Sequence, residues 1–199
     1  MGSGKSQVAL ALAELWRCPA IDLDQRIEQR AGLSIPQIFE RQGESAFRAL
    51  ERSVLAEVLA DPSHKIVALG GGTVVDQESR RRLLSEGILI TLRASLDTLC
   101  ARVGAGKGRP LLAGAGEVRQ RLASVLAQRA AAYAECHAEL VTDDLSVREI
   151  AQAVDRVVTD APIVVPLGER TYRVEVGAGT RHALGRRARG AVTGAQLVL

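Results

Sequence analysis

The chain has 199 residues, of which 47% are hydrophobic and 25% are charged, and its formal net charge is +3. These proportions are those of an ordinary soluble globular protein. No apolar run approaches the roughly 20 residues that a membrane-spanning helix needs, so no membrane partner is expected.

The cysteines and the basic residues further narrow the class of protein. Cys18, Cys100 and Cys136 are scattered and odd in number, which is typical of a reducing cytoplasm without a disulfide framework or a metal cluster. The basic residues are interleaved with acids, and aromatic residues make up only 3%. The longest basic run, Arg80–Arg82, is interpreted as a solvated helix face. We therefore expect a cytoplasmic protein with no nucleic-acid partner.

The first six residues carry half of a phosphate-binding loop of the pattern G-x-x-x-x-G-K-[ST]. The residues present are Gly2, Ser3, Gly4, Lys5 and Ser6. In such a loop, backbone N–H groups surround the β-phosphate, the lysine binds β- and γ-phosphate oxygens, and the serine hydroxyl binds Mg²⁺. The helix that follows adds the positive end of its dipole. The motif predicts nucleotide binding but does not specify the reaction.

Helices alternate with short apolar strands along the chain. Helices are predicted over 5–17, 24–31, 34–41, 44–60, 77–86, 95–103, 117–136 and 146–159, and strands over 20–22, 65–69, 88–92 and 139–142. Ser34 with Gln37 and Ser146 with Glu149 have the spacing of capping boxes, and Gly43 ends the short helix before it. The alternation predicts an α/β fold with a mostly parallel sheet between layers of helices.

After the last of these helices the pattern changes to two short strands, 163–167 and 171–176, whose tight connection predicts antiparallel pairing. A basic, helical stretch then leads to another strand from residue 196. The segment 161–199 is too short for a core of its own. We therefore expect residues 1–160 to form one domain and the remainder to be the incomplete start of a second.

Two carboxylates end the predicted strand over 20–22. Asp22 and Asp24 lie two residues apart at the point where a helix begins. One of them can hold the water shell of Mg²⁺ while the other binds a substrate hydroxyl and takes its proton. The alternative is that Asp24 only caps the helix.

Arg48 lies on the predicted helix 44–60, and its guanidinium can bind a carboxylate through two hydrogen bonds. Glu51 stands three residues further on and can orient it. A surface salt bridge between the two is the alternative. Gly70–Gly72 directly follows a strand, which indicates close approach of the backbone to a ligand, with a plain turn as the alternative.

The glycine-rich stretch 104–116 contains Arg109-Pro110-Leu111-Leu112. It predicts a mobile lid that brings a cation to the transferring phosphoryl group. Arg129 and Tyr133 follow on the next helix, one turn apart.

In this order the motifs resemble the shikimate kinase family, which has the nucleoside monophosphate kinase-like P-loop fold. The match runs from Met1 to about Val158. Its segments are Gly2-Ser3-Gly4-Lys5-Ser6, Asp22-Leu23-Asp24, Ile38-Phe39, Gly43-Glu44, Phe47-Arg48-Ala49-Leu50-Glu51, Gly70-Gly71-Gly72, Arg109-Pro110-Leu111-Leu112 and Arg129-x-x-x-Tyr133. Each segment is weak alone, and the specificity lies in their order.

The resemblance implies ATP-dependent phosphorylation of the shikimate 3-hydroxyl in aromatic amino acid (chorismate) biosynthesis, by a monomeric kinase domain. The implied ATP-binding residues are Gly2, Ser3, Gly4, Lys5, Ser6, Arg102 and Arg109, with Arg102 stacked on the adenine. The implied Mg²⁺ site is Ser6 with Asp22, the latter acting through water. The implied shikimate-binding residues are Asp24, Arg48, Gly70, Gly71, Gly72 and Arg129, with the two arginines on the carboxylate. The implied catalytic residues are Lys5, Asp24 as the base, and Arg109 on the transferred phosphoryl group.

A second resemblance begins near residue 163. It is to the start of 3-dehydroquinate synthase, an NAD-dependent metal enzyme of the same pathway, and rests on Val165-Pro166-Leu167-Gly168-Glu169-Arg170-Thr171-Tyr172 and Val174-x-Val176-Gly177. None of that family's metal-binding or main catalytic segments is present. The resemblance implies that the kinase domain is fused to a dehydroquinate synthase-like domain.

The kinase pattern departs from its family at the front, where the first strand and the opening P-loop glycine have no counterpart. That strand is central in the family, so we expect a chain starting at Met1 to lack ladder partners for two neighbours and to fold poorly. The true start is then expected upstream of Met1, with a decayed or fragmentary gene as the alternative.

Two other functions stay open. One is a non-catalytic, damaged kinase fragment that only binds substrate or scaffolds a fused synthase. The other is a different small-molecule kinase, such as a gluconate kinase, against which Asp24, Arg48 and Arg129 together favour a small carboxylated polyol.

Overall fold

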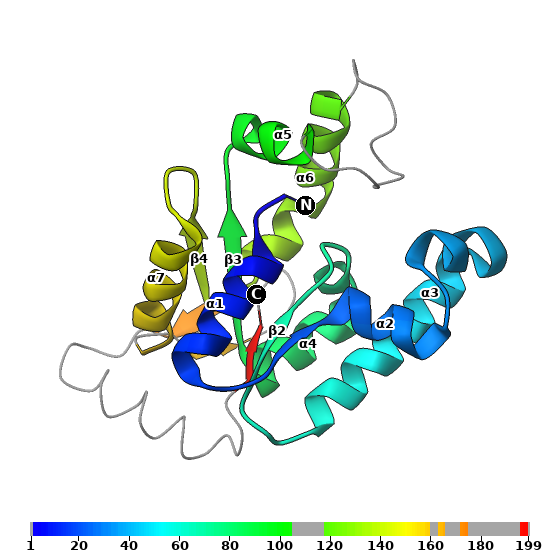
Figure 1. The fold of residues 1–199 in the computed structure, drawn as a ribbon, viewed down its shortest axis with the longest axis horizontal. Helices are drawn as coiled ribbons and strands as arrows, with labels where there is room; N and C mark the ends of the chain where they lie inside the picture. The colour runs from blue at the N-terminus through cyan, green and yellow to red at the C-terminus, as the bar shows by residue number, and fades with distance from the viewer. Residues whose placement is uncertain (1, 105–117, 160–162, 166–171, 175–195, 199) are drawn as a thin grey trace.

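The computed structural model describes residues 2–104, 118–159, 163–165, 172–174 and 196–198 of the chain. The helices are α1 (Lys5–Trp16), α2 (Leu23–Ala31), α3 (Ile35–Ala60), η1 (Thr73–Val75), α4 (Gln77–Glu86), α5 (Leu96–Gly104), α6 (Val118–Ala134) and α7 (Val147–Thr159). The strands are β1 (Ala20–Asp22), β2 (Lys65–Ala68), β3 (Ile88–Arg93), β4 (Ala138–Val141), β5 (Ile163–Val165), β6 (Tyr172–Val174) and β7 (Gln196–Val198). They agree with the predicted elements to within one or two residues at most ends (Figure 1).

Five of the strands form one sheet in the order β1-β2-β7-β3-β4, and every neighbouring pair in it is parallel. The predicted α/β fold with a parallel sheet is therefore confirmed. Because parallel strands end at the same edge, the turns that follow β1 and β2 lie side by side. Asp22 ends β1 and pairs with Ala68 at the end of β2, so this edge brings the predicted carboxylates next to the three glycines.

The central position of the sheet is taken by β7, the last strand of the chain. Its residues pair in parallel with Lys65–Val67 of β2 on one side and Ile88–Leu89 of β3 on the other. The strand expected from residue 196 is present, and it pairs with the two central neighbours that we expected to lack partners. The physical reason is that buried backbone N–H and C=O groups on β2 and β3 need partners, so an extended segment between them is stabilised.

The two faces of the sheet carry separate cores. Ile66 and Ala68 of β2 point to the face covered by α1 and α7, whereas Val67 and Leu69 point to the face covered by α2, α3 and α4. This alternation is the period of two expected for a strand buried on both faces. The fully buried residues of the α1 and α7 side include Val8, Leu12 and Val154, and those of the other side include Leu23, Ile27, Ile38 and Leu83.

Two local predictions about helix ends are confirmed. The backbone N–H of Ser34 donates to Gln37 Oε1 over 2.9 Å, and that of Ser146 donates to Glu149 Oε2 over 2.8 Å, as capping boxes require. Gly43 has φ 80° and breaks α3 into the two predicted helices. Only glycine adopts that backbone conformation without strain, so this residue fixes the kink within α3.

Beyond α7, β5 and β6 pair with each other in antiparallel register, Val164 opposite Arg173, as the spacing of the two strands predicted. Among the residues that the structure describes, no helix is both long enough and apolar enough to cross a membrane.

Candidate active site

The phosphate-binding motif runs into the first turn of α1, and its Ser6 contacts Asp22 at the end of β1. Gly4 has φ 81° and precedes the helix, and the first intrahelical bond runs from Val8 N to Gly4 O over 3.0 Å. N–H groups in a first helical turn have no intrahelical partner and, with the helix dipole, favour an anion. Gly2–Ser6 therefore lie at the N-terminal end of α1, and their binding of phosphate stays a prediction.

Ser6 and Asp22 meet beside this loop. The Ser6 hydroxyl donates to Asp22 Oδ2 over 2.6 Å, while Asp22 Oδ1 accepts from the backbone N–H groups of Asp24 and Gln25 over 3.1 and 3.3 Å. Asp22 is thus the N-cap of α2, and the alternative in which Asp24 is the cap is wrong. A hydroxyl and one fixed carboxylate fit Mg²⁺, which usually takes one or two protein oxygens together with phosphate and water.

Asp24 faces the first of the three glycines. A Cβ atom on Gly70 would stand 2.7 Å from Asp24 Oδ1, so only the absence of a side chain allows the carboxylate to lie there. Burial raises the pKa of Asp24, the negative charges of Asp22 and Glu51 raise it further, and the positive charge of Lys5 partly opposes them. A carboxylate with a raised pKa is a stronger proton acceptor than an ordinary one.

Arg48 faces the third glycine. A Cβ atom on Gly72 would stand 2.6 Å from Arg48 Nη1. Nη1 donates to Glu51 Oε2 over 2.6 Å, and Nε and Nη2 lie 3.4 and 3.3 Å from Glu44 Oε1. Burial acts to lower the pKa of Arg48, but the hydrogen bonds and charges of Glu51 and Glu44 outweigh it and the pKa is raised. The guanidinium therefore stays charged beside the glycine.

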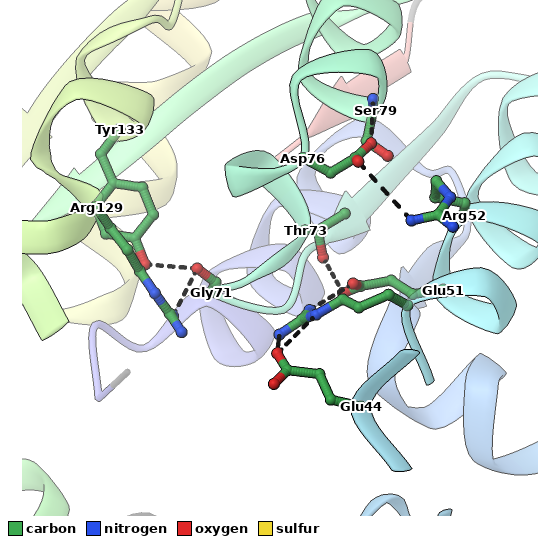
Figure 2. Close-up of polar contacts among 10 residues, drawn as sticks. Glu44, Glu51, Arg52, Gly71, Thr73, Asp76, Ser79, Arg129 and Tyr133 are labelled. Carbon is green, nitrogen blue, oxygen red and sulfur yellow. Dashed lines mark hydrogen bonds and ion pairs between the residues drawn. The ribbon is translucent and has the colours of Figure 1, made fainter. Parts of the chain in front are cut away.

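Glu51 is buried, with only 4% of its surface exposed, so the alternative of a surface salt bridge is wrong. Its second carboxylate oxygen, Oε1, accepts a 2.6 Å hydrogen bond from Thr73 Oγ1. Glu51 thus ties Arg48 to η1, directly after the glycines, and Figure 2 shows its contact with Thr73. Thr73 was not predicted as a site residue, and its place next to the three glycines is the signal that would have indicated it.

The middle glycine is contacted from α6. Arg129 Nη1 and the Tyr133 hydroxyl both donate to the carbonyl oxygen of Gly71, over 2.8 and 2.7 Å. Figure 2 shows the two side chains reaching this oxygen together, from the side opposite Glu51 and Glu44. One N–H of the guanidinium is thereby fixed, and a guanidinium has five such donors.

The three glycines are therefore the centre of the site. Gly70–Gly72 does form a turn, with Thr73 N donating to Gly70 O over 3.1 Å, but a plain turn does not account for its neighbours. Each glycine lies against a different predicted substrate residue: Gly70 against Asp24, Gly71 against Arg129, and Gly72 against Arg48. These three residues come from α2, α6 and α3, and the turn is what brings them together.

A cavity of about 490 Å³ opens next to this group. Its lining includes Ser3, Lys5, Gly70, Gly71 and Tyr133, and the rest of the lining is mostly apolar. Asp24, Arg48 and Arg129 are not part of the lining. The polar site therefore lies at the side-chain contacts around the glycines, and the cavity adjoins it on the α6 side.

Two predicted ATP-binding residues, Arg102 and Arg109, lie away from the three glycines in the sequence. Arg102, at the end of α5, donates to the carbonyl oxygen of Thr142 over 3.0 Å, and its contact with adenine stays a prediction. Arg109 and the predicted lid around it lie outside the described residues.

One prediction about the basic run 80–82 is wrong. Arg80 is not on a solvated face: it is 8% exposed and binds η1 and Glu135, which follows α6. The sequence does carry a signal for this, because Arg80 stands three and four residues before the buried Leu83 and Leu84 and so shares their side of α4.

The sequence profile of the shikimate kinase family matches residues 1–159. The chain belongs to the shikimate kinase family. It is 38% identical over 155 residues to a shikimate kinase of Thermus thermophilus, covering 77% of this chain and 83% of that one. It is 46% identical over 138 residues to a shikimate kinase of Gloeobacter violaceus, covering 68% and 75%.

Solved shikimate kinases have the same fold. A structure of shikimate kinase from Acinetobacter baumannii in complex with shikimate matches with a TM-score of 0.73 at 34% identity, covering 79% of this chain and 88% of that one. The enzyme from Bacteroides thetaiotaomicron matches with a TM-score of 0.73 at 27% identity. The chain is accordingly a P-loop kinase, and shikimate kinases use ATP and Mg²⁺.

Proposed function

We propose that this chain transfers the γ-phosphoryl group of ATP to a hydroxyl group of shikimate, a step of aromatic amino acid biosynthesis. Family membership supports the reaction, and one observation supports the residues that carry it out. This is the contact of a different charged side chain, Asp24, Arg129 or Arg48, with each of three consecutive glycines.

The charges of these residues match the acceptor. Shikimate has one carboxylate and several hydroxyl groups on a ring. Arg48 and Arg129 lie on two sides of the glycines and together provide the cations for the carboxylate. Asp24 lies over Gly70 and accepts hydrogen bonds from hydroxyl groups. The Gly70–Gly72 backbone has no side chains, which leaves room for these three charged groups beside it.

The phosphate residues act on the donor. Gly2, Ser3 and Gly4 surround the β-phosphate with backbone N–H groups, and Lys5 binds the β- and γ-phosphate oxygens. Ser6, together with Asp22 through water, would hold Mg²⁺, which neutralises phosphate charge when bound. We propose that Arg102 contacts the adenine and that Arg109 acts on the transferred phosphoryl group.

The chemical step then follows from these positions. The acceptor hydroxyl oxygen forms a bond to the γ-phosphorus, the bond from that phosphorus to the β–γ bridging oxygen breaks, and ADP leaves. The hydroxyl proton passes to the Asp24 carboxylate, whose raised pKa suits it for this role. Lys5 and Arg109 stabilise the charge on the oxygens of the transferred group.

The test is ADP release by the 199-residue chain, measured with shikimate, with the methyl ester of shikimate, and with gluconate. We expect turnover with shikimate, and a much higher KM for the ester because it lacks the charge that Arg48 and Arg129 bind. Equal turnover with gluconate would favour a different small-molecule kinase. ATP binding measured by calorimetry without any shikimate-dependent turnover would favour the non-catalytic alternative.

We also propose that the kinase unit, residues 1–160, is fused to a dehydroquinate synthase-like unit that begins near residue 161, and that the protein is cytoplasmic. The antiparallel pairing of β5 and β6 agrees with the strands expected there, and the free thiols of Cys18, Cys100 and Cys136 suit a reducing compartment. Detection of the kinase in a cell extract, by an antibody against residues 1–160, gives the size of the native polypeptide. A native mass equal to that of this chain would contradict the fusion.

A further inference from the structure

Arg80 joins two parts of the molecule that are far apart in sequence. It lies on the buried side of α4, and its Nη1 donates to the carbonyl oxygens of Val74 and Val75 in η1, over 2.7 and 3.3 Å. Nη2 donates to Glu135 Oε1 over 3.1 Å, and Nε lies 3.0 Å from Glu135 Oε2. One planar guanidinium therefore holds two backbone carbonyls of one segment and a carboxylate of another.

The two segments are the same ones that meet at the substrate site. Glu135 follows α6 directly and stands two residues after Tyr133, which binds Gly71. Val74 and Val75 follow Thr73, which binds Glu51. The contact of α6 with Gly71 and the contact of Glu135 with Arg80 are thus two separate connections between α6 and the segment that begins with the glycines.

We propose that the Arg80–Glu135 pair is a positioning unit for the substrate-carboxylate side of the site. It holds the end of α6 against the 70–75 segment, so that Arg129 keeps its place over Gly71 relative to Arg48 over Gly72. The inference rests on the proposed role of Arg129. Neither Arg80 nor Glu135 is expected to touch a substrate.

The chemistry of the pair explains why an arginine is used. Arg80 is 8% exposed, and its three acceptors lie in two directions, which a guanidinium fork can reach and a single ammonium cannot. A lysine would keep the positive charge next to Glu135 but could not bind both segments. Arg80→Lys therefore separates loss of charge from loss of the connection.

The same helix offers a matched control. Arg82 and Glu86 form an ion pair within α4, with Arg82 Nε 2.9 Å from Glu86 Oε1. Both side chains are more than a third exposed, and the pair touches neither η1 nor α6 in the contacts of the described residues. The variants Arg82→Met and Glu86→Gln change the same kinds of group on the same helix without affecting the connection.

The experiment measures KM for shikimate, KM for ATP, kcat and Tm of Arg80→Lys, Arg80→Met, Glu135→Gln, the Arg80→Met/Glu135→Gln double variant and the control variants. We expect KM for shikimate to rise by about tenfold in the Arg80 and Glu135 variants, with KM for ATP unchanged within about twofold. The double variant should be no worse than the worse single variant, since the residues act as a unit. The control variants should leave both KM values unchanged.

A second readout does not depend on catalysis. Hydrogen exchange of backbone amides, without substrate, should accelerate in Arg80→Lys at both 70–75 and 130–135, and in the control at neither. Equal increases of both KM values in proportion to the fall in Tm would overturn the proposal, as would an unchanged KM for shikimate. Faster exchange at only one of the two segments would also contradict it. Absence of shikimate turnover in the unmodified chain would instead refute the proposed function, and the exchange result would still report on the connection.

Discussion

The phosphate side and the acceptor side of this site are built in different ways. The phosphate side consists of Gly2–Ser6, which are consecutive in the sequence, together with Asp22. The acceptor side joins Asp24, Arg48 and Arg129 from α2, α3 and α6 around one turn. In the proposed function, anion binding on the first side depends largely on backbone N–H groups and a helix end, whereas recognition on the second side depends on charged side chains.

The difference shows where each side gains its rigidity. A backbone loop before a helix is fixed by local conformation, as the positive φ of Gly4 indicates. The charged side chains of the acceptor side need partners in the interior: Glu51 for Arg48, and the Gly71 carbonyl for Arg129. We therefore expect substitutions on the acceptor side to change shikimate kinetics selectively, and to do so even when the substituted residue contacts no substrate.

The largest effect is expected for Asp24→Asn. The amide cannot accept the hydroxyl proton, and loss of a general base lowers kcat by about 10²–10⁴-fold. ATP binding should change little, because Asp24 lies on the acceptor side. ADP release and calorimetry measure the two quantities. A kcat within about threefold of the unmodified chain would show that Asp24 is not the base.

The same substitution should raise the free energy of unfolding, and the sign of this change follows from the pKa of Asp24. Burial and the charges of Asp22 and Glu51 raise the pKa of Asp24 above its ordinary value of 3.8, so the folded state binds this proton more tightly than the unfolded state. Ionisation then costs stability, by an amount that grows as pH rises from 3.8 through the raised pKa and stays constant above it. Asp24→Asn should therefore have a higher Tm at neutral pH, with a gain that shrinks as pH is lowered towards 3.8.

The next largest effect is expected for Arg129→Met on the acceptor side. Removing a charged hydrogen-bond donor from the substrate carboxylate costs about 1.5–3 kcal/mol, or roughly 10–150-fold in KM for shikimate. With the methyl ester of shikimate, KM should differ far less between the unmodified chain and this variant than it does with shikimate. The reason is that the ester lacks the charge that Arg129 binds. If KM rises equally for the ester and for shikimate, Arg129 acts on the fold and not on the carboxylate.

The difference between the phosphate side and the acceptor side also explains which features the sequence predicted well. The phosphate loop, the capping boxes and the break at Gly43 depend on neighbours within a few residues, and their residue types indicate them directly. The role of Asp24 and the set around Gly70–Gly72 were expected from the family resemblance, but their mutual contacts depend on the sheet order. The spacing of these residues in the sequence does not indicate that Gly71 lies against Arg129 or that Gly72 lies against Arg48.

What the sequence did not predict depends on long-range packing. Asp22 was expected to serve the metal, but its second role as N-cap depends on where α2 begins. In the sequence, Arg80 is part of a basic run, which favoured an exposed position. It is buried because η1 and Glu135 provide hydrogen-bond acceptors that only the fold brings together. The pairing of Gln196–Val198 in the middle of the sheet follows from vacant partners on two strands more than 100 residues earlier in the chain.

A proline at Leu197 tests that central strand. Leu197→Pro removes one N–H from a strand that pairs on both sides, and an unmade buried hydrogen bond costs about 1–3 kcal/mol. For a chain of this size Tm should fall by roughly 3–10 °C, with nucleotide binding weakened because α1 packs on the same sheet. Arg173→Pro, in the two-stranded pair β5–β6, is the control and should change Tm less. Equal Tm values for Leu197→Pro and the unmodified chain would show that β7 does not stabilise the sheet.

The smallest effect is expected at Glu44, and its sign distinguishes two roles for this residue. Glu44 is exposed and lies 3.3 Å from Arg48 Nη2, whereas Glu51 is buried and lies 2.6 Å from Nη1. Exposed ion pairs are worth about 0.2–1 kcal/mol, so a substrate carboxylate can displace Glu44 from Arg48 but not Glu51.

Glu44→Gln should therefore lower KM for shikimate by about two- to fivefold, because Arg48 no longer has to exchange one carboxylate for another. Glu51→Gln should have the opposite sign and raise KM, because it releases Arg48 from Thr73 and from Gly72. An increase of KM in both variants would mean that Glu44 orients Arg48 together with Glu51. Arg48 would then be held by two carboxylates on its own helix, and the acceptor side would be more local in construction than the contacts with the glycines indicate.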